Sequence, residues 1–232
     1  MKKTLIIFDI DGTLLYSNKI DSLCFTAAYK TIFGKPFPSI DWRKFPHVTD
    51  DTIFKTAFQE QHNRLPEKSE ENAFRDHYVG ILQEKRKTDP AAFKEVPGSK
   101  NTIDQLRLDD QYVIGIGTGG WEKPARVKLK HLHISTQDIY ISCADNQPTR
   151  EGILEKSITD AKAAHDHIER IVYVGDAIWD VKTTRNMQLN FLGIRRAGDY
   201  EILELAGAKN IITDYSDYDY FLNQIEKAVP PN

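Results

Sequence analysis

The stretch FDIDGT, residues 8–13, places two aspartates one residue apart. Carboxylates at this spacing repel each other, and a fold tolerates that cost when a metal ion or a reaction uses them. Asp9 ends an apolar, strand-like run, and Asp11 follows in the turn. Gly12 permits a backbone conformation that other residues avoid, and Thr13 offers a hydroxyl and a backbone N–H for a phosphate. The stretch is therefore a candidate centre for acid–base or nucleophilic chemistry.

Two further strand-like runs end in residues of related chemistry. Asp176 ends the run RIVYVGD, and Asp180 lies one helical turn further on. The run QYVIGIG leads into Thr118. Carboxylates gathered at one edge need a hard cation, and magnesium accepts oxygen ligands together with a substrate phosphate. These residue types predict phosphoryl transfer, in which one aspartate can be the nucleophile and a second carboxylate the acid and base.

The relative positions of these residues depend on the elements that carry them. After residue 97, strand-like segments such as QYVIGIG, DIYISCA, RIVYVGD, NFLGI and NIITD alternate with helical ones. This alternation predicts an α/β fold of the Rossmann-like, doubly wound type, with a mainly parallel sheet covered on both faces. Ligands of such sheets bind outside the carboxyl ends of the strands. We therefore expect the three strand ends described above to meet at one edge.

The segment between the first strand and these alternating elements has a different sequence pattern. It carries amphipathic helical patterns and almost no strand signal. We therefore expect a discontinuous core, formed by residues 1–16 and 97–232, and an inserted α-helical cap, formed by residues 17–96. The hinges would lie at residues 16–18 and in the proline-bounded segment 89–97.

Composition and charge argue against several classes of protein. The chain has 232 residues and a net charge of −3, which gives no electrostatic reason to expect nucleic acid or an anionic membrane as a partner. No apolar run is long enough to span a bilayer. Two cysteines, Cys24 and Cys143, form no disulfide framework, so we expect a reduced, cytoplasmic protein. A monomer or a weak homodimer is compatible with the sequence.

FDIDGT, GTGG and GDAIWD, in this order, resemble the motifs of the haloacid dehalogenase (HAD) superfamily of phosphatases. The resemblance runs through the whole chain and includes a helical cap of the C1 type, as in the subgroup of phosphoglycolate phosphatases and β-phosphoglucomutases. It implies that Asp9 is the nucleophile and Asp11 the acid and base. It also implies a Mg2+ site formed by Asp9, Asp11 through its backbone carbonyl, and Asp176. Asp180 would either bind the metal as a further ligand or contact a ligand residue without touching the metal. Thr118 would bind the phosphate.

Two positions depart from the family pattern. Gly119 stands where asparagine is often found, which puts a contact to substrate or cap in question. The usual lysine in a Lys-Pro context is replaced by the segment TREGILEKS. By spacing, Arg150 falls closest to the expected position and could bridge carboxylate and phosphate, whereas the nearest lysine, Lys156, lies further into the helix. We expect Arg150 to take the catalytic role and keep Gly119 and Lys156 as candidates for binding phosphate.

The sequence favours one function and leaves others open. The favoured hypothesis is a Mg-dependent hydrolase of a small phosphorylated metabolite that forms an aspartyl-phosphate, with the segment 46–54 of the cap facing the site. The second aspartate argues against dehalogenases and phosphonate-cleaving enzymes. A sugar-phosphate mutase, an inorganic pyrophosphatase and a non-catalytic phosphate-binding relative are the alternatives. GIGTGG also fits a dinucleotide-binding fingerprint, with Asp138 or Asp145 as its acidic residue, but that interpretation leaves the other aspartates unexplained.

Overall fold

A six-stranded parallel sheet forms the centre of the computed structural model, which describes residues 2–145 and 147–232. The strand order is β5-β4-β1-β6-β7-β8, and all neighbours pair in parallel. The strands are β1 (Lys3–Phe8), β4 (Tyr112–Gly117), β5 (Ile139–Ser142), β6 (Ile168–Gly175), β7 (Asn190–Ile194) and β8 (Ile211–Ile212). Within the described residues, none of the helices has both the length and the apolar character needed to cross a membrane.

Helices cover both faces of this sheet. Ile6 and Phe8 of β1 belong to a larger hydrophobic cluster, and Leu5 and Ile7 to a smaller one on the other face. The larger cluster includes side chains of α4 (Ser99–Leu106), α5 (Glu122–His131) and α9 (Tyr218–Lys227). The smaller one includes side chains of α6 (Arg150–Ala164), α7 (Ile178–Asn186) and α8 (Glu201–Ala206). A strand buried on both faces has an uninterrupted apolar sequence, and the predicted doubly wound α/β core is confirmed.

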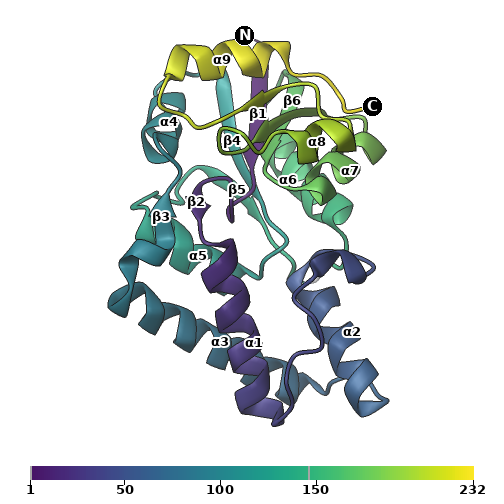
Figure 1. Ribbon diagram of the computed structural model, residues 1–232. Coiled ribbons are helices and arrows are strands. Elements are labelled where there is room, and N and C mark those ends of the chain that lie inside the picture. Colours follow the sequence, from purple (N-terminus) through teal and green to yellow (C-terminus); the bar gives the residue numbers. More distant parts are fainter. Residues whose placement is uncertain (1, 146) are drawn as a thin grey trace.

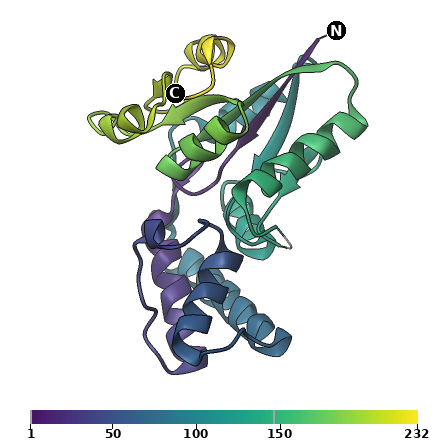
Figure 2. The same cartoon turned by 90° about the vertical axis from the view of Figure 1, so that its right-hand side faces the viewer.

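Three helices gather at the end of the sheet toward which β1 runs (Figures 1 and 2). They are α1 (Asn18–Phe33), α2 (Asp50–His62) and α3 (Lys68–Thr88), with short 3₁₀ helices at Trp42–Lys44 and Pro90–Phe93. Their shared core is aromatic: the ring centroids of Phe54 and Phe74 are 4.6 Å apart, and those of Phe25 and Phe74 are 4.9 Å apart. Trp121, which precedes α5, packs 6.0 Å from Phe25 and joins this group to the rest of the molecule. Aromatic pairs at these distances stabilise the packing beyond their buried area.

The two connections between the sheet and these helices run side by side. β2 (Leu15–Tyr16) and β3 (Lys94–Glu95) pair in an antiparallel ladder. The sequence did not predict these two-residue strands, because neither is long enough to show a pattern. We keep the division into a core of residues 1–16 and 97–232 and a cap of residues 17–96 as a proposal.

Candidate active site

The carboxyl ends of β1, β4 and β6 border a cavity of about 230 Å³, which α1 and α2 close from the other side. The polar side chains in its lining are mainly carboxylates. They belong to Asp9, Asp11, Asp21, Asp50 and Asp176, and Thr118 adds a hydroxyl. The predicted meeting of three strand ends at one edge is therefore found in the structure.

Asp9 follows β1 and is held at the cavity by the sheet. Its backbone N–H donates to the Val174 carbonyl of β6 over 2.9 Å. Its side chain is buried, and its Oδ1 atom has no hydrogen-bond partner among the described residues. Burial raises the pKa of Asp9 to about 7, and the nearby Arg150 guanidinium partly opposes that rise. A buried oxygen without a partner is available to a cation or to a reacting phosphorus atom.

The carboxylates of Asp9, Asp176 and Asp180 form an acidic cluster in which one oxygen from each lies within 4.8 Å of the others. Burial and these neighbouring charges raise the pKa of Asp176 well above its usual value. Gly12 gives the cluster room, because a Cβ there would lie 2.0 Å from Asp176 Oδ2, and its φ of +82° is accessible to glycine. Closely spaced oxygen donors, one without a partner, fit a hard divalent cation.

Asp180 lies behind the other two carboxylates and is fully buried. Its Oδ1 accepts a hydrogen bond from Arg150 Nη2 over 2.5 Å, and its Oδ2 accepts one from the Ala177 N–H over 3.0 Å. Arg150 Nη2 also donates to the Tyr173 hydroxyl over 2.8 Å and lies 3.7 Å from Asp9 Oδ1. Because its oxygens are already bonded, Asp180 is suited to fixing the guanidinium rather than to binding a cation directly.

The arginine explains the glycine that follows Thr118. A Cβ at Gly119 would lie 2.5 Å from Arg150 Nη1 and 2.5 Å from the Val48 carbonyl oxygen. Any larger residue, including the asparagine common in the family, would collide with both. The two departures from the family pattern are therefore linked, since the bulk of the guanidinium occupies the space that a side chain at position 119 would need.

Asp11 is anchored by a lysine that the sequence analysis missed. Lys128 Nζ lies 2.6 Å from Asp11 Oδ2 and 2.5 Å from Asp21 Oδ1, and the Lys128 side chain is almost wholly buried. The Ser17 hydroxyl donates to the other oxygen of Asp11, and the Tyr78 hydroxyl donates to Asp21 over 2.5 Å. The available signal was the position of Lys128 in the apolar stripe of its helix, where a charged residue needs a buried partner.

The loop after β4 is fastened to the start of α2. Thr49 caps this helix by accepting the Thr52 N–H over 3.3 Å. The Asp50 N–H donates to the Gly119 carbonyl over 2.8 Å, and Asp50 Oδ2 accepts the Trp121 N–H over 2.9 Å. Burial, followed by the charge of Asp21, raises the pKa of Asp50 to about 8. Asp50 is thus a rigidly held carboxyl in the cavity wall.

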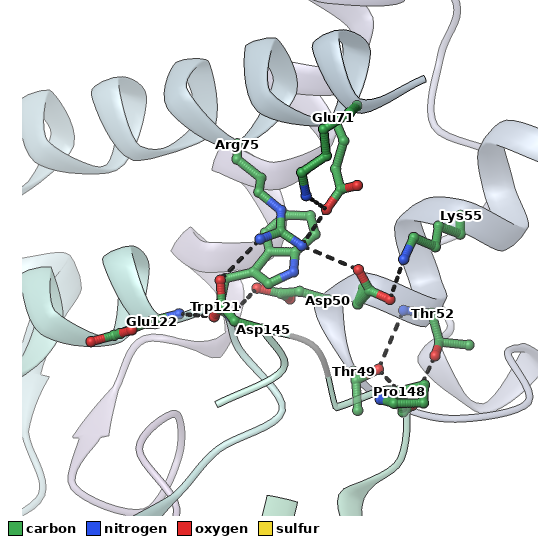
Figure 3. A network of polar contacts seen from close by, with 12 residues as sticks. Thr49, Asp50, Thr52, Lys55, Glu71, Arg75, Trp121, Glu122, Asp145 and Pro148 are labelled. Carbon is green, nitrogen blue, oxygen red and sulfur yellow. Dashed lines mark hydrogen bonds and ion pairs between the residues drawn. The ribbon is translucent and has the colours of Figure 1, made fainter. Parts of the chain in front are cut away.

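Arg75 of α3 makes a second connection between the helical group and the rest of the molecule (Figure 3). Its guanidinium lies 2.5 Å from Glu71, one turn earlier on α3, and 3.1 Å from Asp51 of α2. It also lies 2.9 Å from Asp145, which follows β5, and its Cζ is 4.2 Å from the centre of the Trp121 indole. One side chain therefore combines ion pairs with a cation–π contact across the boundary.

The sequence pattern of the family described as haloacid dehalogenase-like hydrolase matches residues 6–194. The chain belongs to this family. The match includes every strand end and helix that contributes a carboxylate to the acidic cluster. The predicted superfamily and the prediction that the chain is a hydrolase are thereby confirmed. No curated protein shows a significant sequence match.

Several solved structures share the fold over nearly their whole length. A hydrolase from Pseudomonas syringae has a TM-score of 0.72 at 19% identity, with 97% of this chain and 99% of that chain covered. A predicted phosphatase from Clostridium acetobutylicum has a TM-score of 0.65 at 19% identity, covering 98% and 100% of the two chains. A predicted phosphoglycolate phosphatase from Haemophilus somnus has a TM-score of 0.63 at 17% identity, covering 96% and 99%. At these identities the similarity establishes the HAD fold.

Three of the predicted phosphate-binding residues are not in the lining of this cavity: Gly12, which lines the neighbouring pocket beside Asp176, Thr13 and Lys156. Lys156 pairs with Asp160 over 2.7 Å on the exposed side of α6, so the prediction that it binds phosphate is wrong. It follows Arg150 by six residues, which is a rotation of about 240° around the helix, and it therefore faces away. The Thr13 side chain is fully buried outside the cavity lining, and its carbonyl accepts the Tyr215 hydroxyl over 3.1 Å. Thr13 supports the turn.

The remaining predicted residues lie together. Thr118 lines the cavity, with its backbone N–H bonded to Ser142 and its hydroxyl oxygen accepting the Gly120 N–H over 3.3 Å. Gly119 lines it as well, as do Val48, Asp50 and Ile53 from the segment 46–54 that was expected to face the site. Asp21 was not foreseen, because its place in the wall depends on how α1 packs over the sheet.

Proposed function

We propose that this protein is a magnesium-dependent phosphatase that hydrolyses the phosphomonoester of a small metabolite through a phosphorylated Asp9. The observation that carries the proposal is Asp9 Oδ1, which has no hydrogen-bond partner among the described residues although Arg150 lies 3.7 Å away. Asp11, two residues further on, lines the same cavity and can act as the proton donor. The fold shared with proteins named as phosphatases supports the same reaction class.

The residues at the cavity divide the reaction between them. Asp9 Oδ1 attacks phosphorus as the bond to the ester oxygen breaks, and Asp11 gives its proton to the leaving alcohol. Water then attacks the phosphorus of the aspartyl-phosphate while Asp11 accepts a proton, which restores the Asp9 carboxylate and releases inorganic phosphate. Arg150, positioned by Asp180, offsets the charge on Asp9 and on the phosphoryl oxygens. The Thr118 hydroxyl donates to a phosphoryl oxygen.

The acidic cluster gives the magnesium ion its place in this proposal. Asp9, Asp176 and the backbone carbonyl of Asp11 would hold the ion, which when bound supplies positive charge to the phosphoryl oxygens. The helices α1 and α2 border the cavity and limit the access of bulk water to the reacting groups. A cavity of about 230 Å³ suits a small ester better than a phosphorylated protein.

The test is phosphate release from p-nitrophenyl phosphate by the wild type and by Asp9→Asn, with magnesium and with a chelator. We expect release from the wild type with magnesium only, and a loss of at least about a thousandfold in Asp9→Asn because the nucleophile is gone. Asp160→Asn, which changes an exposed carboxylate of α6, is the matched control and should retain activity.

Each component of the proposal can fail separately. Activity retained by Asp9→Asn would rule out the nucleophile, and activity in the chelator would rule out the metal requirement. A folded wild-type protein that is stabilised by magnesium but releases no phosphate would indicate a mutase or a ligand-binding relative.

A further inference from the structure

The cavity extends beyond the reacting atoms toward the helices, and that extension must receive the leaving alcohol. A phosphoryl group placed between Asp9, Thr118 and Arg150 has its ester oxygen pointing toward α1 and α2, since the sheet edge closes the other side. The wall there combines the rings of Phe25 and Trp42 with the carboxylates of Asp21 and Asp50. An alcohol bound in this space therefore meets apolar surface and hydrogen-bond acceptors.

The charge of this wall is negative. Among the side chains that the structure places in the lining, Arg150 is the one cation, and it is already committed to Asp180. The nearest ammonium, that of Lys128, lies between Asp11 and Asp21 and neutralises them. Among the described residues that line this cavity, no further cation remains to meet a second anionic group on the substrate, and Lys19, Arg195 and Arg196 line the neighbouring pocket on the other side of Asp176. A buried anion without a partner costs several kcal/mol, so such a substrate is disfavoured.

Asp50 is the acceptor best placed to select the alcohol. Its carboxyl is fixed through Oδ2 by the Trp121 N–H at 2.9 Å, and its backbone is fixed by the Gly119 carbonyl at 2.8 Å. It also lies next to the phosphate loop, because a Cβ at Gly120 would be 3.7 Å from both Asp50 Oδ2 and Thr118 Oγ1. A donor on the second carbon from the ester oxygen can reach an oxygen of this carboxyl while the phosphoryl group stays in place.

We propose that Asp50 and the surrounding wall select phosphate esters of small alcohols that carry a hydroxyl or amino donor and no second anionic group. This inference rests on the proposed phosphatase activity and specifies its substrate class. Esters whose alcohol bears a carboxylate, such as phosphoglycolate, should therefore be poor substrates. One structure with the same fold is named as a predicted phosphoglycolate phosphatase.

Three probes of equal length test the proposal. 2-Hydroxyethyl phosphate, phosphoethanolamine and phosphoglycolate have two-carbon leaving groups that end in a hydroxyl, an ammonium and a carboxylate. For the wild type with magnesium at pH 9, where the Asp50 carboxyl, whose pKa is about 8, is ionised, we expect kcat/KM for the first two to exceed that for phosphoglycolate by at least about tenfold, as for a hydrogen bond to a charged group. Asp50→Asn should reduce this ratio by at least about fivefold, because the charge disappears while an oxygen for the Trp121 N–H remains.

Asp51→Asn is the matched control, since Asp51 lies beside Asp50 in the first turn of α2 but pairs with Lys55 and Arg75 and is absent from the cavity lining. If Asp51→Asn alters how α2 packs over the cavity, kcat/KM should change equally for all three probes. The ratio of kcat/KM between the donor-bearing probes and phosphoglycolate should therefore stay the same. An equal or higher kcat/KM for phosphoglycolate in the wild type would overturn the inference, as would a ratio that Asp50→Asn leaves unchanged. The wild-type comparison decides the matter if Asp50→Asn does not fold.

The aryl phosphate separates the two levels of failure. Release from p-nitrophenyl phosphate without any preference among the probes, or without activity on them, would reject the substrate class and leave the phosphatase proposal standing. No release from any ester by the folded protein with magnesium would reject both.

Discussion

Lys128 joins residues that are far apart in the sequence and belong to different parts of the fold. Its ammonium lies between Asp11 at the sheet edge and Asp21 in the first turn of α1. These two carboxylates raise the pKa of the lysine even though its burial acts in the opposite direction. Lys128 is therefore a positioning residue for Asp11, the proposed acid and base. Its positive charge stabilises the folded protein when Asp11 and Asp21 are both ionised.

Replacing this lysine should be costly for stability. Lys128→Met leaves Asp11 and Asp21 facing each other without a cation, and we expect a loss of about 3–5 kcal/mol in the free energy of unfolding, as found when one partner of a buried ion pair is removed. Urea denaturation at neutral pH measures the loss. The second change Asp21→Asn should recover part of it, because one of the unpaired carboxylates is removed. Full stability in Lys128→Met alone would show that the triad contributes nothing.

At the scale of elements, two sets of ion pairs connect the group of helices α1, α2 and α3 to the rest of the molecule. They differ in how much they stabilise this arrangement. Arg75 is mostly buried and combines ion pairs with the Trp121 ring, whereas the pair of Lys123 and Asp76 is exposed on both sides. Exposed pairs contribute little because water screens them and the long side chains lose entropy. We therefore expect Arg75 to hold the helices over the cavity.

The change Asp145→Asn tests this expectation with little disturbance. It removes the charge that Arg75 meets on the sheet side but keeps an oxygen for the Glu122 N–H, which donates to Asp145 over 2.6 Å. We expect kcat/KM for the aryl phosphate to fall about 3–10-fold, which corresponds to a loss of about 1 kcal/mol in the closed arrangement. Lys123→Met is the control and should stay within twofold of the wild type. An equal effect of both changes would contradict the special role of Arg75.

At the scale of the whole molecule, the acidic cavity makes stability depend on pH. Burial raises the pKa values of Asp9 and Asp50 to about 7 and about 8, above the value of 3.8 that a carboxyl has in an unfolded chain. The folded protein therefore binds these protons more tightly than the unfolded chain does. The associated stability is complete below about pH 4 and is lost as the pH rises through about 7 and 8.

We expect this loss to be measurable in a chelator, where no metal competes with the protons. Asp50→Asn cannot titrate at this position, so its free energy of unfolding should gain about 1–2 kcal/mol on that of the wild type between pH 5 and pH 8. Urea denaturation of both proteins at each pH gives the difference, in which contributions from other groups cancel. A difference that is constant with pH would show that Asp50 titrates normally.

The sequence revealed the sheet edge because its signals are local. An apolar run ending in Asp9, a second ending in Asp176 and a third leading to Thr118 are each legible in a few residues, and parallel pairing brings such ends together. Lys128 and Asp21 could not be placed in this way, and neither could the individual contacts of Asp50 within the predicted segment 46–54. Their contacts depend on how α1, α2 and α5 pack against one another, and helix packing leaves little trace in any one segment.

The position of β1 in the sheet has a consequence for how the chain is made. Thr4 pairs with Tyr112 on one side and with Arg170 on the other, so β1 precedes α1, α2 and α3 in the sequence but lies between strands that follow them. While the ribosome adds those helices, KTLIIF has both edges unpaired and no sheet to join. A nascent chain halted before residue 112 thus exposes an apolar strand, and Asp9, the proposed nucleophile beside it, acquires its surroundings only after β4 and β6 have been synthesised.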